Sequence, residues 1–260
     1  MVQVSMDGPN VNLKTQRDLE KISRTKYDHG LLNNGSCPIH QLHNAAKAAM
    51  EGKGYVGEFL TRLFKLFHDA PARREEYKKL CKSLGLSPVF PQSFALHRWA
   101  DNKRAAARAI EMLPGSVAFC TAIENKQKGI TKIDTQSYGV VRDFVLDKFA
   151  KVKLLFFIDL CELIEDFLVK FQSDKPLAPF VINEIYNIVR DMQRRFLIIS
   201  YCEHCESEQL KDDLRFQKYY VPPKRLTLGG GLTNLLKNFC KMKKYQMLKL
   251  SNLMKNAEII

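Results

Sequence analysis

The sequence contains no long apolar stretch that is free of charge. Its most apolar part, residues 145–171, is interrupted by lysines and acids along its whole length. A membrane-spanning helix needs about 18 or more nearly uncharged residues, so this stretch is excluded as a span. The N-terminus also lacks the basic start and apolar run of a signal peptide. We therefore expect no membrane partner.

Because there is no signal peptide, the seven cysteines indicate a reducing compartment and free thiols. We expect a soluble, intracellular protein of the nucleus or cytoplasm. No glycine-rich phosphate loop is present, since residues 229–231 are not followed by the Lys-Ser/Thr pair that such a loop requires. No Ser-His-Asp or Cys-His-Asn order stands out either. With 260 residues and 16 phenylalanines, the chain can bury a sizeable core.

Acidic residues are absent from residues 214–257, which hold ten lysines and arginines. This segment carries most of the net charge of +13, and the pI is near 9.4. Such an excess favours a polyanionic partner, most often nucleic acid. The alternative is the solvated side of a helix whose apolar residues pack inward. The candidate nucleic-acid contacts are Lys224, Arg225, Lys237, Lys241, Lys243 and Lys244.

Apolar residues at helical spacing predict a mostly α-helical chain. Two short strands are expected within about the first forty residues, one before Asp7 and one after a turn at residues 31–37. Proline and glycine mark the helix ends, as at Pro71 and Gly85. The predicted helices are residues 11–26, 41–51, 56–67, 71–84, 102–113, 144–171, 182–199 and 232–254.

Asp7 follows a short apolar alternation formed by Val2, Val4 and Met6 and precedes Gly8-Pro9. This pattern predicts a strand that delivers a carboxylate to a sheet edge, where metal-dependent nucleases and transferases place their acids. Asp7 is therefore a candidate catalytic residue and Mg²⁺ ligand. The alternative is a helix cap for the residues that follow.

Three short motifs occur in a fixed order and resemble those of the hAT-type transposases and transposon-derived relatives. Asp7, Asn10 and Asn12 match a T-D-N-x-S-N-M-like motif. Cys37 and His40 match a C-x-x-H-x-L-N motif, with His43-Asn44 a turn on. Arg98-Trp99 match an R-W motif further on. The resemblance covers roughly residues 1–110.

The resemblance implies a ribonuclease-H-like core with a DDE triad that holds two Mg²⁺ ions. Only the middle acid, Asp7, is identified, because the first would lie upstream of Met1 and the last has no good candidate. We therefore expect a decayed, catalytically inactive protein. The implied organisation is a partial ribonuclease-H-like α/β segment at residues 1–54, a helical insertion-type domain at residues 55–220 and a basic segment at residues 221–260.

The sequence is compatible with three functional hypotheses. The first is non-specific nucleic-acid binding or protein interaction, including self-association, without cofactor. The second is an active DDE nuclease or transposase, which needs two further carboxylates near Asp7. The third is a zinc-stabilised module in which Cys37 and His40 join the Cys202-Glu203-His204-Cys205 run. Trp99 is expected in the core, and Arg98 to pair with a carboxylate or a DNA phosphate.

Overall fold

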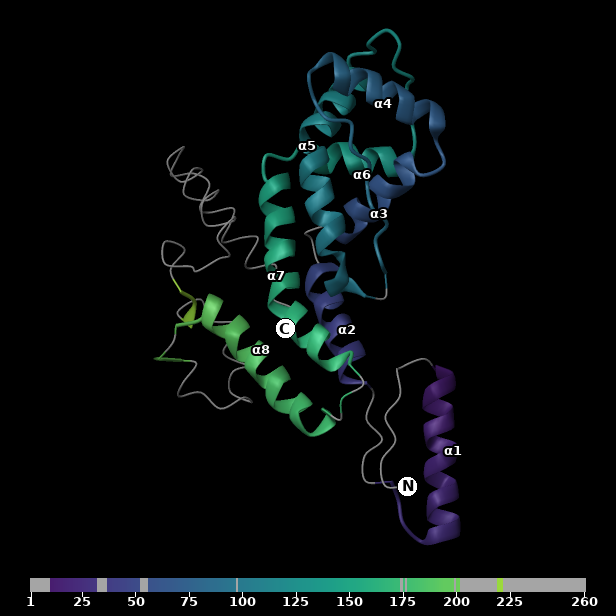
Figure 1. The fold of residues 1–260 in the computed structure, drawn as a ribbon, viewed down its shortest axis with the longest axis vertical. Coiled ribbons are helices and arrows are strands. Elements are labelled where there is room, and N and C mark those ends of the chain that lie inside the picture. The colour runs from purple at the N-terminus through teal and green to yellow at the C-terminus, as the bar shows by residue number, and fades with distance from the viewer. Residues whose placement is uncertain are drawn as a thin grey trace.

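The computed structural model describes residues 10–31, 37–51, 56–96, 98–173, 175, 177–198, 200–201 and 219–221. In this part of the chain the protein is all-α (Figure 1). The α-helices are α1 (Asn10–Tyr27), α2 (Pro38–Glu51), α3 (Val56–Phe67), α4 (Pro71–Ser83), α5 (Lys103–Glu124), α6 (Gln136–Val145), α7 (Ala150–Phe171) and α8 (Val181–Phe196). Two 3₁₀ turns are η1 (Trp99–Asn102) and η2 (Ala178–Phe180).

The core lies among α3, α4, α5, α6 and α7, with α5 packed along α7 and α3 along α6. Seven of the twelve residues of α3 are buried, because its apolar residues recur every three or four positions. Aromatic rings fill the space between helices: the rings of Phe59 and Phe144 stack at 3.9 Å between centroids. Tyr77 from α4 meets Phe67 at 5.0 Å and Phe119 at 5.7 Å.

Helix α5 is longer than the sequence predicts, because it continues through Pro114 and Gly115 to Glu124. Proline removes one backbone hydrogen bond, which normally ends or kinks a helix. Burial of the second half, including Phe119 and Ile123, offsets that loss. Gly115 is needed there, since a Cβ would lie 2.6 Å from the Tyr77 hydroxyl. The predicted end at residue 113 is therefore wrong.

The single helix predicted for residues 144–171 is two helices, α6 and α7. The break lies at residues 146–149, where Asp147 accepts a hydrogen bond from the Phe149 backbone at 2.9 Å. The same carboxylate pairs with Lys153 at 2.9 Å. Asp147 thus satisfies a backbone donor at the start of α7, so the apolar stripe continues although the helix does not.

The prediction of an α/β segment is corrected in the described part of the chain. After Cys37, where the second strand is expected, the chain forms helix α2 from Pro38 on, and residues 32–36 lie outside the described residues. Proline suits the first helical turn, and the alanine-rich residues that follow favour helix. The first expected strand lies in residues 1–9, outside the described residues, as does the predicted helix at residues 232–254. Among described residues, β pairing is limited to one antiparallel bridge, Leu197 with Tyr220.

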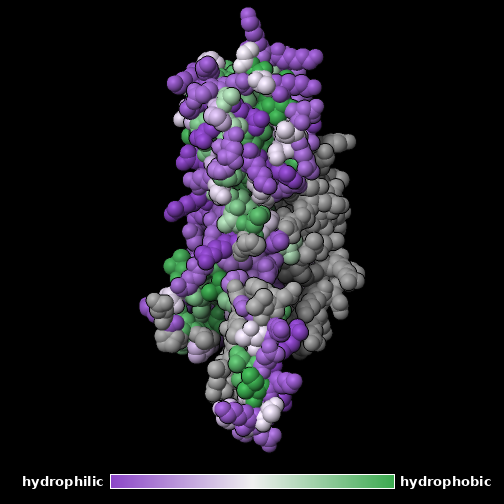
Figure 2. All heavy atoms as spheres, turned by 90° about the vertical axis from the view of Figure 1, so that its right-hand side faces the viewer, coloured by the Kyte–Doolittle hydropathy of each residue, from purple (hydrophilic) through white to green (hydrophobic). Residues whose placement is uncertain are grey.

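Helix α8 lies on α7 with one buried ion pair at its end. Arg195 donates to the Asp159 carboxylate at 2.6 Å, and the Asp159 side chain is 8 % exposed. Ile188 is the single fully buried residue of α8. Figure 2 shows a different face, the right-hand side of Figure 1, where hydrophilic residues predominate toward the upper end and hydrophobic ones gather lower down.

Among the described helices, α5 alone is long and apolar enough to cross a membrane by length and composition. More than half of its most apolar window, 56 %, is buried against other helices. The core helix of a globular protein meets the same criteria, so this helix is weak evidence for a membrane span.

Candidate functional site at the junction of α2 and η1

The structure brings two of the three sequence motifs together, although they are far apart in the chain. Helix α2 carries the C-x-x-H motif, and η1 begins with the tryptophan of the R-W motif. The two elements pack against each other, and α2 also contacts α3 and α7. His43 of α2 thereby lies within electrostatic range of His40, Arg98 and Asp101. We refer to these four residues as the junction cluster.

Asn102 organises the backbone around the R-W motif. Its side chain is buried, and its amide nitrogen donates to the carbonyl oxygens of Ala95, Arg98 and Trp99 at 3.0, 3.1 and 3.1 Å. Its carbonyl oxygen accepts from the Ala95 backbone at 2.7 Å. One side chain therefore satisfies four backbone groups, which fixes the position of Arg98. Asn102 is not among the residues predicted from the motifs. Its position directly before a helix is the signal of an N-cap, but its side chain bonds to the preceding loop instead of capping α5.

Trp99 is confirmed as a core residue, since 4 % of it is exposed. Its ring meets Phe94 edge-on at 5.0 Å and lies 6.5 Å from Phe157. The other side of the ring lies against α3, where a Cβ on Gly57 would be 2.2 Å from the indole. Glycine is therefore required at position 57, and the close approach locks η1 onto α3.

His43 is the unusual member of the junction cluster, because it is buried with 3 % exposure. Among the described residues, neither of its ring nitrogens has a hydrogen-bond partner. Burial lowers the pKa of His43, Asp101 opposes this shift, and His40 and Arg98 add to it. The imidazole is therefore held neutral at pH 7.

Arg98 is the accessible charge of the junction cluster, with 68 % of its side chain exposed. Its guanidinium lies 4.0 Å from the Asp101 carboxylate, a distance typical of a loose surface pair. An exposed arginine on a fixed backbone can bind a phosphate through two parallel hydrogen bonds. The arrangement can thus bind an anion, whereas His43 is too enclosed to exchange protons with a substrate.

Cys37 and His40 gather no third metal ligand in the described part of the chain. Cys37 is a half-buried free thiol just before α2, and His40 is exposed on its first turn. No group of three His, Cys, Asp or Glu side chains that could hold a metal is found among the described residues. The other zinc ligands proposed from sequence, Cys202, His204 and Cys205, lie outside them.

Several predicted site residues lie outside the described residues or are described only in part. Asn10 is the first residue of α1, and Asn12 is half-buried two positions later. Neither contributes to the junction cluster. The predicted residues outside the described ranges are Asp7, Lys224, Arg225, Lys237, Lys241, Lys243 and Lys244.

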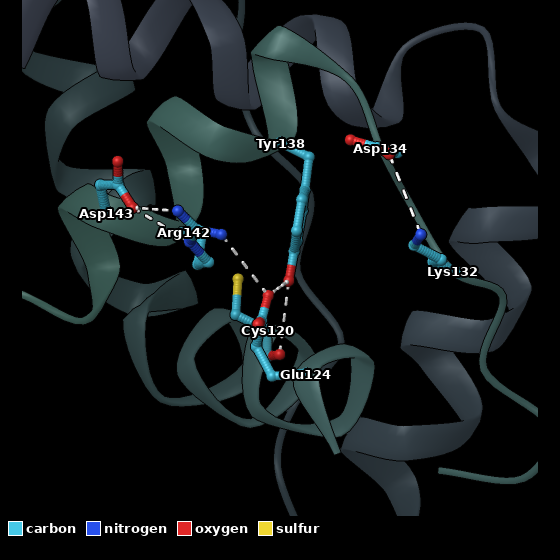
Figure 3. A network of polar contacts seen from close by, with 7 residues as sticks. All are labelled: Cys120, Glu124, Lys132, Asp134, Tyr138, Arg142 and Asp143. Atoms are coloured by element: carbon cyan, nitrogen blue, oxygen red, sulfur yellow. Dashed lines mark hydrogen bonds and ion pairs between the residues drawn. The ribbon is translucent and has the colours of Figure 1, made fainter. Parts of the chain in front are cut away.

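A second polar network joins α5 to α6 (Figure 3). The Tyr138 hydroxyl donates to the Glu124 carboxylate at 2.8 Å, and Arg142 lies 3.8 Å from the same carboxylate. Burial, with the nearby Glu124 charge, raises the pKa of the Cys120 thiol to about 12. A thiol must ionise to act as a nucleophile, so Cys120 is a packing residue. The network holds α5 and α6 together.

No protein-family model matches the chain, and neither curated proteins nor solved structures give a match.

Proposed function

We propose that this chain is a transposon-derived, hAT-like protein that binds nucleic acid through its phosphates and has lost DDE catalysis. The observation that carries the proposal is the packing of α2 on η1, which unites the C-x-x-H and R-W motifs. Two motifs about sixty positions apart in the chain therefore lie side by side in the fold. In the proposal they serve as a structural support that presents Arg98 to a phosphate.

The charge of the chain supports the same partner. A net charge of +13 attracts polyanions over distances up to about one Debye length, roughly 8 Å at physiological salt. Asp7, which lies outside the described residues, enters the proposal as a relict metal carboxylate. Catalysis by two Mg²⁺ ions requires several carboxylates around them, and one acid cannot hold both.

The test is a binding titration of the full chain with a fluorescently labelled DNA duplex of about 30 base pairs. We expect a Kd in the range of roughly 10⁻⁴ to 10⁻⁶ M near physiological salt, rising steeply as salt is added. Arg98→Gln should weaken binding a few-fold without changing thermal stability. Lys128→Gln, which removes a charge from the exposed loop after α5, is the matched control.

A nicking assay on supercoiled DNA with Mg²⁺ and with Mn²⁺ completes the experiment. We expect no cleavage above that of an Asp7→Asn variant. Cleavage that this variant abolishes would establish an active metal-dependent nuclease instead. Failure of the wild-type chain to bind duplex at low salt would overturn the proposed function itself.

A further inference from the structure

Helix α1 carries four basic residues at the positions i, i+3, i+7 and i+10. They are Lys14, Arg17, Lys21 and Arg24, and all four are exposed. At about 100° per residue, these positions fall within an arc of roughly 80°, so they form a single row along the helix. With a rise of about 1.5 Å per residue, the row is roughly 15 Å long. We refer to it as the α1 basic stripe.

The α1 basic stripe lies away from the side of the helix that the rest of the protein covers. Gln16, about 120° around the helix from the middle of the stripe, is buried with 4 % exposure. Two acids flank the stripe. Asp18 is exposed one turn from Lys14 and Lys21, without an ion pair to either. Glu20 accepts a hydrogen bond from the Leu31 backbone at 2.7 Å and pairs with Arg24 at 2.7 Å. Glu20 thus fixes the turn after α1, and its charge offsets that of Arg24 only.

The α1 basic stripe is accessible to a large partner. Figure 1 shows α1 at the lower end of the molecule, beside the other helices rather than between them. Helix α1 forms no interface with another described helix comparable to that of α5 with α7. Within the described ranges, Lys14, Arg17 and Lys21 have no acidic partner. Three cations along one side are therefore free to bind phosphates.

The composition of α1 distinguishes between classes of polyanion. A helix that lies on a membrane surface needs a continuous apolar side opposite its cations. On α1 the exposed large apolar residues are Ile22 and Tyr27, more than a turn apart, and the mean hydropathy of the helix is low. A helix with a row of cations and few apolar residues is better matched to a nucleic-acid backbone.

We propose that the α1 basic stripe is a docking surface for the phosphate backbone of duplex DNA. This inference rests on the proposed function and assigns the contact to a specific helix. Duplex DNA carries one charge per about 1.7 Å of its axis, so a row of roughly 15 Å faces several phosphates. The contact is with phosphates, and binding is therefore independent of base sequence.

The experiment compares two triple variants of the full chain. Lys14→Gln, Arg17→Gln and Lys21→Gln together remove the unpaired charges of the stripe. Lys79→Gln, Lys82→Gln and Lys128→Gln remove the same charge from exposed positions at the opposite end of the molecule. Glutamine favours helix, and circular dichroism with thermal melting confirms that both variants fold.

We expect the stripe variant to bind a 30-base-pair duplex roughly ten-fold or more weakly at 0.1 M salt. The slope of log affinity against log salt should fall by about 2 to 3, since each lost phosphate contact contributes about 0.9. The control should lose less than three-fold. A conservative Lys14→Arg and Lys21→Arg variant should bind like the wild type.

Other outcomes overturn the inference. Equal losses in the two triple variants would show that net charge acts without a docking surface. A stripe variant that binds as tightly as the wild type would remove α1 from the interface and leave the proposed function intact. If the wild type bound vesicles containing phosphatidylserine but no duplex, the partner would be a membrane surface and both proposals would fail.

Discussion

Helices α3 and α8 are both strongly amphipathic, yet they differ in how much of their surface is buried. In α3, seven of twelve residues are buried. In α8, one of sixteen is buried, and Ile182 and Tyr186 are 75 % and 59 % exposed. The reason lies in their neighbours: α3 packs against α2, α4, α5, α6 and α7, whereas α8 packs against α7 and η2.

An amphipathic pattern in the sequence therefore predicts that a helix has an apolar side, but it does not predict which other element, if any, covers that side. The apolar arc of α8 is wider than the surface that α7 offers. Val181, Ile185 and Met192 pack against the core, while Ile182 and Tyr186 lie on the flank of the helix. Stability is therefore concentrated around α3, and the outer helices are available for contacts with partners.

The largest expected effect is on the apolar residues themselves. Leu63→Ala in α3 should lower the free energy of unfolding by about 3 kcal/mol, because Leu63 is 1 % exposed and its removal leaves a cavity. Ile182→Ala in α8 should change it by less than about 0.5 kcal/mol. Urea denaturation followed by circular dichroism measures both. Comparable losses at the two positions would show that α8 is covered as α3 is.

A smaller effect is expected at the close approach between Gly57 of α3 and Trp99. Gly→Ala in a helix normally stabilises by about 0.5–1 kcal/mol. At Gly57 the new Cβ would lie 2.2 Å from the indole, so we expect a loss of about 2 kcal/mol instead. Gly139 in α6, with nothing within 4 Å of a Cβ, is the matched control and should show the normal gain. The same sign at both positions in thermal melts would contradict the packing.

The smallest effect concerns His43, which the fold holds neutral between α2 and η1. The pKa of His43 lies below its usual value of 6.5 in the folded state. As the pH falls through 6.5, the unfolded chain therefore takes up a proton that the folded chain does not, and stability decreases. His43→Leu should raise stability by about 1 kcal/mol at pH 7.5, since two unpaired nitrogens are removed.

The gain from His43→Leu should widen at pH 5, where the wild type has lost stability. Urea denaturation at the two pH values measures this, and His68→Gln gives the contribution of an exposed histidine. An unchanged gain between pH 7.5 and pH 5 would mean that His43 is protonated in the folded protein.

Periodicity predicts the helices whose ends are marked by local signals. The prediction of α1, α3 and α4 is confirmed within about two residues, with Pro71 at the start of α4 and Gly85, at a φ of +68°, after its end. The errors arise where tertiary contacts decide. Pro114 is tolerated because the second half of α5 is buried. Residues 146–149 break a continuous apolar pattern where the Asp147 carboxylate accepts a hydrogen bond from the Phe149 backbone just before α7.

The residues of the candidate site that belong to a sequence motif could be predicted, whereas those whose role depends on tertiary packing could not. Arg98, Trp99, Cys37 and His40 are visible in the sequence as motif residues, and Trp99 is confirmed in the core. Asn102 acts through its hydrogen bonds to Ala95, seven positions earlier, which the intervening loop folds back to bring within reach. No local pattern reveals such a return, nor the contact of Gly57 with a ring over forty positions away.

Trp99 has a practical consequence as the single tryptophan of the chain. Its indole is buried beside Phe94 and Phe157 and lies where η1 meets α3 and α7. Native fluorescence excited at the red edge of aromatic absorption therefore comes from one known place. A shift of that emission reports the opening of this junction without any label. Parts of the molecule far from Trp99 contribute no tryptophan emission.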